Sequence, residues 1–229
     1  MNQVKQRKRI VVFDVNETLL DIEILNPFFE RRFGDARVMR QWFAELILYS
    51  QALTLSGSYT EFGKLAVAVL TMVADVKGVC LEAGHIEDFK DHMRRLPAHQ
   101  DAAPALEILR DAGFRLVTLT NSAPDAGSSA LDKSGIAHFF EKQFSVNGVK
   151  RFKPAAETYR SVESALGVEA GSLRLVAAHT WDTLGAIAAG WKAALVTRQG
   201  NAPLAFGDQP DIIGSDLLAV ANRIISHDV

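Results

Sequence analysis

Apolar residues form short runs along the chain, and each run ends in polar residues. Runs of this kind predict strands at residues 10–13, 115–119, 142–146, 173–177 and 192–196, with a shorter one near 211–213. Apolar residues at helical spacing alternate with them and predict helices at 101–112, 124–134, 155–166, 182–189 and 215–226. This alternation predicts a Rossmann-like α/β fold: a doubly wound parallel sheet with helices on both faces.

Residues 23–97 break the alternation with a long helical pattern. Segments such as 41–49 and 62–73 are apolar at helical spacing, and Pro97 marks the end of the stretch, because proline stops helices. We therefore expect an all-helical cap domain at 21–97, inserted into a core domain made of 1–20 and 98–229. The cap is expected to lie over the carboxyl edge of the sheet.

Composition excludes several classes of protein. The chain has 229 residues, 48% of them hydrophobic, and a net charge of −2, so it can bury a large core and shows no basic stripe for nucleic acid. Asp14 interrupts the apolar run that follows the basic residues 5–9, which argues against a signal peptide. No run is long enough for a membrane span. We expect a cytoplasmic protein whose single cysteine, Cys80, is buried and forms no internal disulfide.

Four strand ends carry residues suited to chemistry. Asp14 follows the first strand, where open α/β sheets bind their ligands, although an Asp there can also simply cap backbone amides. Thr120 and Asn121 end a second apolar run, and Lys153 ends the short segment 151–153, just ahead of a proline that we expect to start a helix. Asp182 follows the run at 173–177.

In order and spacing these residues resemble the four motifs of the haloacid dehalogenase superfamily. Its motifs are a nucleophilic Asp, a Ser or Thr, a Lys and a distal acid, matched here by Asp14, Thr120, Lys153 and Asp182. The resemblance runs from residue 10 to about 200. It implies a core with a cap and covalent catalysis by Asp14.

Within the superfamily the chain resembles L-2-haloacid dehalogenases more than phosphatases. Phosphatases carry a second Asp two residues after the nucleophile, as a general acid, where this chain has Asn16. They also bind Mg²⁺ through extra acids, whereas the segment 177–182 has one. A departing halide needs neither proton nor metal. The alternatives are a Mg²⁺-dependent phosphatase acting on a small metabolite and an inactive binding protein of this fold.

The resemblance also implies residues that bind substrate. Dehalogenases carry an Arg-Gln pair on a cap helix, matched by Arg40 and Gln41, together with aromatic residues matched by Phe62 and Trp181. Taken singly, Arg40 also fits a solvated helix face, and the two aromatics fit an ordinary core. The chain departs from the family where Asn16 replaces a Tyr and where Ala177 and His179 replace a Ser and an Asn.

The expected reaction has two steps. Asp14 attacks C2 of a short 2-haloalkanoate, and water then hydrolyses the resulting ester. Lys153 keeps Asp14 ionised, Arg40 receives the halide or shares the substrate carboxylate, and Asp182 orients Lys153 or the water. His179 either activates that water or only hydrogen-bonds a neighbouring loop. The expected substrate contacts are Val15, Asn16, Gln41, Phe62, Thr120, Asn121 and Trp181. No metal or cofactor is expected, and two copies of the chain could form a homodimer.

Overall fold

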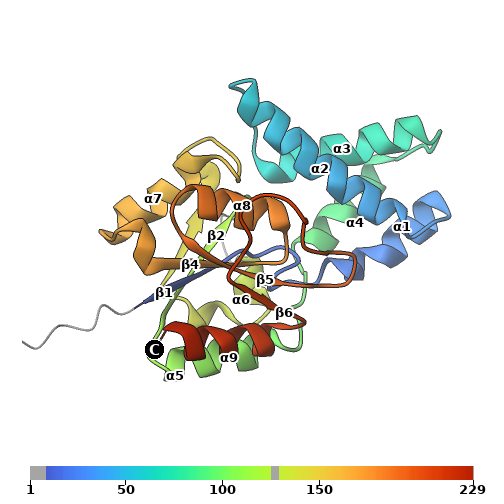
Figure 1. Ribbon diagram of the computed structural model, residues 1–229. Coiled ribbons are helices and arrows are strands. Elements are labelled where there is room, and N and C mark those ends of the chain that lie inside the picture. Colours follow the sequence, from blue (N-terminus) through green and yellow to red (C-terminus); the bar gives the residue numbers. More distant parts are fainter. Residues whose placement is uncertain (1–8, 125–128, 229) are drawn as a thin grey trace, which may run out of the picture.

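The computed structural model describes residues 9–124 and 129–228, which form a sheet flanked by helices and a helical insert beside it (Figure 1). The six strands are parallel and lie in the order β3-β2-β1-β4-β5-β6. Their bounds are β1 Ile10–Phe13, β2 Arg115–Thr120, β3 Lys142–Ser145, β4 Leu173–Ala177, β5 Lys192–Val196 and β6 Ile212–Gly214. The order changes direction at β1, which lies between β2 and β4. The carboxyl end of β1 is therefore the switch point where such sheets bind ligands.

Helices cover both faces of the sheet, as the alternating pattern predicts. In Figure 1, α5 (Ala102–Asp111) and α9 (Leu217–Asp228) lie on one side, and α7 (Ala156–Leu166) and α8 (Thr180–Ala188) lie on the other. Short 3₁₀ turns occur at η2 (Ala137–Phe139), η3 (Val146–Gly148) and η4 (Ala170–Ser172). The parallel α/β fold is confirmed.

Two predicted elements differ from the structure. The helix expected at 124–134 is described only as α6 (Ala130–Lys133), and residues 125–128 lie outside the described residues. Residues 151–153 are not the end of a strand: Arg151 and Phe152 lie in a loop, and Lys153 begins a turn. Only one apolar residue, Phe152, lies between Arg151 and Lys153, which is too little to continue a buried strand.

The helical insert, which we define as residues 22–93, follows β1. It consists of η1 (Ile22–Leu25), α1 (Asn26–Phe33), α2 (Val38–Leu55), α3 (Phe62–Val76) and α4 (Ala83–Met93), as the helical pattern predicts. It has its own aromatic core, in which Trp42 lies against Phe29 and Phe89 with ring centroids 5.6 and 5.1 Å apart. The Trp42 indole also donates to the carbonyl of Ala66 at 3.0 Å, which ties α2 to α3.

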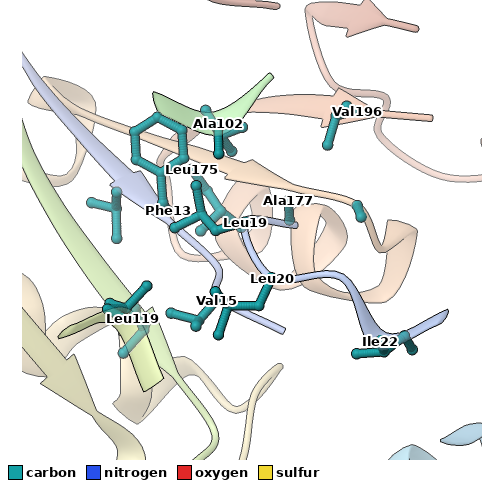
Figure 2. Packing of buried hydrophobic residues seen from close by; sticks show 14 of the residues in the cluster. Phe13, Val15, Leu19, Leu20, Ile22, Ala102, Leu119, Leu175, Ala177 and Val196 are labelled. Carbon is teal, nitrogen blue, oxygen red and sulfur yellow. The ribbon is translucent and has the colours of Figure 1, made fainter. Parts of the chain in front are cut away.

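The loop after β1 is anchored by buried leucines. Leu19 and Leu20 are fully buried, and Figure 2 shows them near Phe13 on β1 and near Leu175 and Ala177 on β4. Burying a leucine contributes roughly 1.5–3 kcal/mol, so this packing holds the turn that carries Asp14.

Cys80 is exposed, so the prediction of a buried thiol is wrong. It lies in the connection between α3 and α4, outside either helix, and its chain neighbours Val79 and Leu81 are only partly buried. None of the described helices combines the length and the apolar character needed to cross a membrane.

Candidate active site

Asp14 is the first residue after β1, and both of its carboxylate oxygens have partners. Its backbone N–H donates to the carbonyl of Val176 at 3.0 Å, which extends the pairing of β1 with β4 by one residue. One carboxylate oxygen, Oδ1, accepts from Lys153 Nζ at 2.7 Å, and the other, Oδ2, accepts from the Thr18 hydroxyl at 2.7 Å. The Thr18 hydroxyl in turn accepts from the Ala178 N–H at 2.8 Å. The carboxylate is thus fixed by groups from three loops.

Lys153 is fully buried between two acids. Its ammonium donates to Asp14, to Asp182 Oδ2 at 2.6 Å and to the carbonyl of Leu119 at 3.0 Å. Asp182 lies in the first turn of α8, where the helix dipole favours a negative charge, and it also accepts from the Tyr159 hydroxyl at 2.7 Å. All three donor positions of the ammonium are therefore satisfied.

His179 continues this line of charges on the other side of Asp14. Its Nδ1 lies 3.6 Å from Asp14 Oδ2, and its Nε2 lies 2.6 Å from Glu17 Oε2. The second oxygen of Glu17 pairs with Arg40 on α2, and Arg40 also pairs with Glu23. From Asp182 to Glu23 the contacts form an alternating chain of acids and bases, which we call the charge chain: Asp182, Lys153, Asp14, His179, Glu17, Arg40 and Glu23.

The charge chain shifts the pKa values of its members. Burial alone would raise the pKa of Asp14, but Lys153 and His179 lower it well below its ordinary range. Burial alone would lower the pKa of His179, but the carboxylates of Asp14 and Glu17 raise it to about 9. Burial opposes a charge on Lys153 too, yet Asp14 and Asp182 raise its pKa. At neutral pH Asp14 is therefore a carboxylate facing two cations.

A cavity of about 780 Å³ lies between the helical insert and the carboxyl end of the sheet, and the two residues that follow Asp14, Val15 and Asn16, are part of its lining. From the sheet side it is lined by Val15, Asn16 and a group of hydroxyl residues, Thr118, Thr120, Ser122 and Ser145. From the insert it is lined by apolar residues, including Phe62, Val67, Phe89 and Met93, and by three charged residues, Glu61, Lys64 and Lys90. It can hold a small molecule with one polar and one apolar end.

The predicted site residues divide between the cavity and the charge chain. Val15, Asn16, Phe62 and Thr120 line the cavity, while Asp14, Lys153, Asp182, His179 and Arg40 form the chain. The Asn121 side chain accepts from the backbone N–H of Lys153 at 3.0 Å and so supports that lysine. Trp181 stacks on His179, with ring centroids 5.2 Å apart. Gln41 is exposed and is not among the residues that line the cavity.

Sequence reasoning missed Glu17, Thr18 and Tyr159. Thr18 is four residues after Asp14, a spacing that allows a hydroxyl to turn back to the carboxylate in a tight loop. Tyr159 lies six residues after Lys153, on α7, and an aromatic residue on a helix is normally expected to be part of the hydrophobic core. Glu17 gave no signal, because a Glu in a polar turn after a strand is normally solvated.

No group of three or more His, Cys, Asp or Glu side chains arranged to hold a metal occurs in residues 9–124 and 129–228. At the centre of the site the space between Asp14 and Asp182 is filled by the ammonium of Lys153.

Comparison with known proteins identifies the family. Residues 8–190 match the haloacid dehalogenase-like hydrolases. The chain belongs to this family. It is 27% identical over 223 residues to (S)-2-haloacid dehalogenase 2 of Pseudomonas sp. (strain CBS-3), with 96% of each chain covered. It is 29% identical over 199 residues to (S)-2-haloacid dehalogenase of Xanthobacter autotrophicus, covering 86% of this chain and 78% of that one.

Solved structures agree with this family. The crystal structure of an L-2-haloacid dehalogenase with 26% sequence identity superposes with a TM-score of 0.90, covering 95% of this chain and 98% of that one. The likeness includes both the sheet and the helical insert, because the covered share is nearly the whole of both chains.

Proposed function

We propose that this hydrolase removes the halogen from short L-2-haloalkanoic acids and produces D-2-hydroxy acids through an ester on Asp14. The observation that carries the proposal is the buried Asp14 carboxylate, which Lys153 holds ionised and which is followed in the chain by Val15 and Asn16, two residues that line a cavity large enough for the substrate. The similarity to haloacid dehalogenases over nearly the whole chain supports it.

In the first step a carboxylate oxygen of Asp14 forms a bond to C2 of the substrate while the carbon–halogen bond breaks and the halide leaves. A carboxylate is a weak nucleophile in water, but holding it in line with the breaking bond removes several kcal/mol of the barrier. Lys153 and Thr18 hold the two oxygens of Asp14 and so fix that orientation. Attack from the side opposite the halogen inverts C2.

The substrate carboxylate has donors available at the sheet end of the cavity. Thr120 and Ser122 have hydroxyls there, and Asn16 Nδ2 lies 3.4 Å from Ser122 Oγ. Phe62 and its apolar neighbours on the insert would surround the alkyl group and exclude water. Arg40 would act on the departing halide from the part of the charge chain that belongs to the insert. Within the described residues Arg40 is connected to Asp14 indirectly: Arg40 pairs with Glu17, Glu17 with His179, and His179 with Asp14.

In the second step water attacks the carbonyl carbon of the Asp14 ester and releases the hydroxy acid. His179 is the candidate base, because its Nδ1 lies 3.6 Å from Asp14 Oδ2, the carboxylate oxygen that Lys153 does not hold. Asp182 would keep Lys153 in place throughout.

The rival activity is a Mg²⁺-dependent phosphatase. Against it stands Asn16, whose amide cannot protonate a leaving alcohol. An inactive binding protein is disfavoured, since a buried chain of charges is costly to desolvate and a scaffold gains nothing from it.

Halide release separates these activities. We expect the purified protein to release chloride from L-2-chloropropionate in the presence of EDTA, and not from the D enantiomer. If several 2-haloacids gave no halide and phosphoesters were hydrolysed in the presence of Mg²⁺, the protein would be a phosphatase.

We further propose that residues 21–97 act as a cap domain on a core of 1–20 and 98–229, and that the protein works in the cytoplasm. Whether it forms a homodimer is decided by size-exclusion chromatography with light scattering.

A further inference from the structure

Glu17 has an unusual backbone and an unusual environment. Its φ of 66° lies in the left-handed region, which residues other than glycine seldom adopt, and its side chain is almost completely buried. Two contacts hold the backbone there: its N–H donates to the carbonyl of Leu20 at 2.8 Å, and its carbonyl lies 3.1 Å from His99 Nε2. Such conformations are kept at functional sites when the surroundings enforce them.

The Glu17 carboxylate fixes the proton on His179. Burial would raise the pKa of Glu17, but its hydrogen bonds with His179 and Arg40 lower it, so the group is ionised and can only accept. The His179 nitrogen that faces it, Nε2, must therefore carry the hydrogen. The remaining nitrogen, Nδ1, is buried without a hydrogen-bond partner in the described part of the chain, and it faces Asp14 Oδ2. Nδ1 is the atom left to exchange a proton next to the nucleophile.

We propose that Glu17 is a positioning residue that holds His179 so that Nδ1 acts as the base when the Asp14 ester is hydrolysed. The proposal rests on the proposed function, in which that ester forms. Glu17 itself acts through His179 and does not touch the substrate.

The step balances as follows. Nδ1 takes one proton from water while the water oxygen forms a bond to the carbonyl carbon of the Asp14 ester. The bond from that carbon to the substrate oxygen then breaks, and the leaving oxygen takes the proton back from Nδ1, which yields the hydroxy acid. Asp14 is left as a carboxylic acid, which loses its remaining proton to solvent and becomes a carboxylate again.

Formation of the ester would itself prepare the base. Before the reaction two carboxylates face His179, Asp14 after β1 and Glu17 in the following turn, and both favour its protonated form. The elements packed against the ring from α2 and α8 present aromatic rings, Phe43 and Trp181. Arg40 and Lys153 lie one step further out, on Glu17 and Asp14. Esterification removes the Asp14 charge, so the His179 pKa falls and Nδ1 gives its proton to solvent.

Glu17→Gln tests the assignment, because glutamine keeps the shape and removes the charge. With L-2-chloropropionate, rapid-quench mass spectrometry should show the Asp14 adduct forming at nearly the normal rate and decaying roughly 10–10²-fold more slowly, because a general base contributes roughly 10²–10⁴-fold and the variant keeps the imidazole but loses the charge that positions it. The pH at which adduct decay is half-maximal should also move to lower pH. Unchanged decay with unchanged pH dependence would overturn the proposal.

Glu23→Gln is the matched control. Glu23 holds Arg40 from the other side and makes no contact with His179, so the pH dependence of adduct decay should remain that of the wild type. A shift equal to that of Glu17→Gln would mean that Arg40, and not His179, carries the effect, and would overturn the proposal.

Two further measurements distinguish a failure of this proposal from a failure of the proposed function. His179→Gln should slow adduct decay, and adding Glu17→Gln to it should cost nothing more, because both act through one imidazole; additive losses would overturn the role. Histidine NMR titration of the free enzyme should show a lower His179 pKa in Glu17→Gln, and an unchanged pKa would overturn the pairing. Absence of halide release by the wild type would overturn the proposed function, while the titration would still report on the pairing.

Discussion

Lys153 is the residue on which the charge balance of the site depends. It is the cation shared by Asp14 and Asp182, and neither its side chain nor that of Asp182 has any exposed surface. A buried charge that loses its partner costs several kcal/mol, because no water can replace the contact. The same contacts hold one oxygen of Asp14 in place, so Lys153 serves stability and reaction together.

Replacing Lys153 with Met should abolish the reaction. The two acids would face each other without a cation, and Asp14 Oδ1 would lose the donor that orients it and lowers its pKa. We expect kcat/KM for halide release to fall by roughly 10²–10⁴-fold, since breaking a buried pair costs about 3–5 kcal/mol. Lys142→Met, at an exposed position on β3, is the control. A loss below tenfold in a folded Lys153→Met protein would remove Lys153 from the mechanism.

His179 should make stability depend on pH. Its pKa is about 9 in the folded protein and about 6.5 in an unfolded chain, so its stabilising contribution is complete below pH 6.5 and is lost as the pH rises through 9. The free energy of unfolding should therefore fall by on the order of 3 kcal/mol between these pH values. Urea titrations at several pH values would measure it. His179→Gln should flatten the pH dependence of the free energy of unfolding. An equally steep fall in that variant would mean that another group causes the dependence.

The sequence predicted some of these residues and not others. Asp14, Lys153 and Asp182 were predictable, because each stands in a recognisable motif at the expected place. Glu17 was not, because its burial depends on His179 and Arg40, which are distant in sequence and meet it only in the fold. Cys80 was predicted buried from its apolar neighbours, but the connection between α3 and α4 leaves it exposed.

At the scale of elements, the packing of α8 against the turn after Lys153 sets the geometry of Asp182. Gly185 on α8 permits this packing: a Cβ there would come within 2.5 Å of Pro154 Cβ and of the Tyr159 hydroxyl. Tyr159 is the group that holds Asp182 Oδ1. A side chain at position 185 would therefore displace Tyr159 and the turn that carries Lys153, the two residues that hold the Asp182 carboxylate.

Gly185→Ala should destabilise the protein and reduce activity. Overpacking of this kind costs about 1–3 kcal/mol, more than the roughly 1 kcal/mol that alanine gains over glycine in a helix. We expect a lower Tm by calorimetry and slower halide release. Gly171→Ala is the control, because no atom lies within 4 Å of its added Cβ and its φ is not positive. Equal Tm values for the two variants would contradict this account of the packing.

Strands were easier to predict than the connections between them. The buried runs at β1, β4 and β5 are short, apolar and bounded by polar residues, so their bounds follow from local pattern. The turn that carries Lys153 has no such pattern. Its shape depends on Asn121, whose side chain accepts from the Lys153 backbone across more than thirty residues of sequence.

At the scale of the molecule, the helical insert and the sheet meet at the site. Thr54 at the end of α2 accepts from the N–H of Phe152, Tyr59 donates to Asn147 at 3.0 Å, and Arg40 pairs with Glu17. Arg40 also donates to the carbonyl of Gln199 at 2.8 Å, in the loop after β5. Because these contacts join the insert to the core and one of them, Arg40 with Glu17, belongs to the charge chain, the position of the insert and the geometry of the charge chain are coupled.

Arg40→Ala should therefore impair the reaction. The loss removes a cation from the charge chain and a link between insert and sheet, and we expect about 2–5 kcal/mol less transition-state stabilisation in kcat/KM. Arg37→Ala is the matched control, since Arg37 is 91% exposed and pairs with Asp35 on the same insert. Near-normal turnover by Arg40→Ala would mean that the contacts of Arg40 with Glu17 and Glu23 do not support the reaction.

The central claim is that Asp14 forms a covalent ester that water hydrolyses at the Asp14 carbonyl. Isotope labelling tests it most directly: the enzyme turns over L-2-chloropropionate many times in ¹⁸O-water, and the peptide containing Asp14 is then weighed by mass spectrometry. The account predicts ¹⁸O in the Asp14 carboxylate, because each hydrolysis leaves a solvent oxygen on the enzyme. An unlabelled Asp14 together with ¹⁸O in the hydroxy acid from the first turnover would mean direct attack by water and would contradict the account.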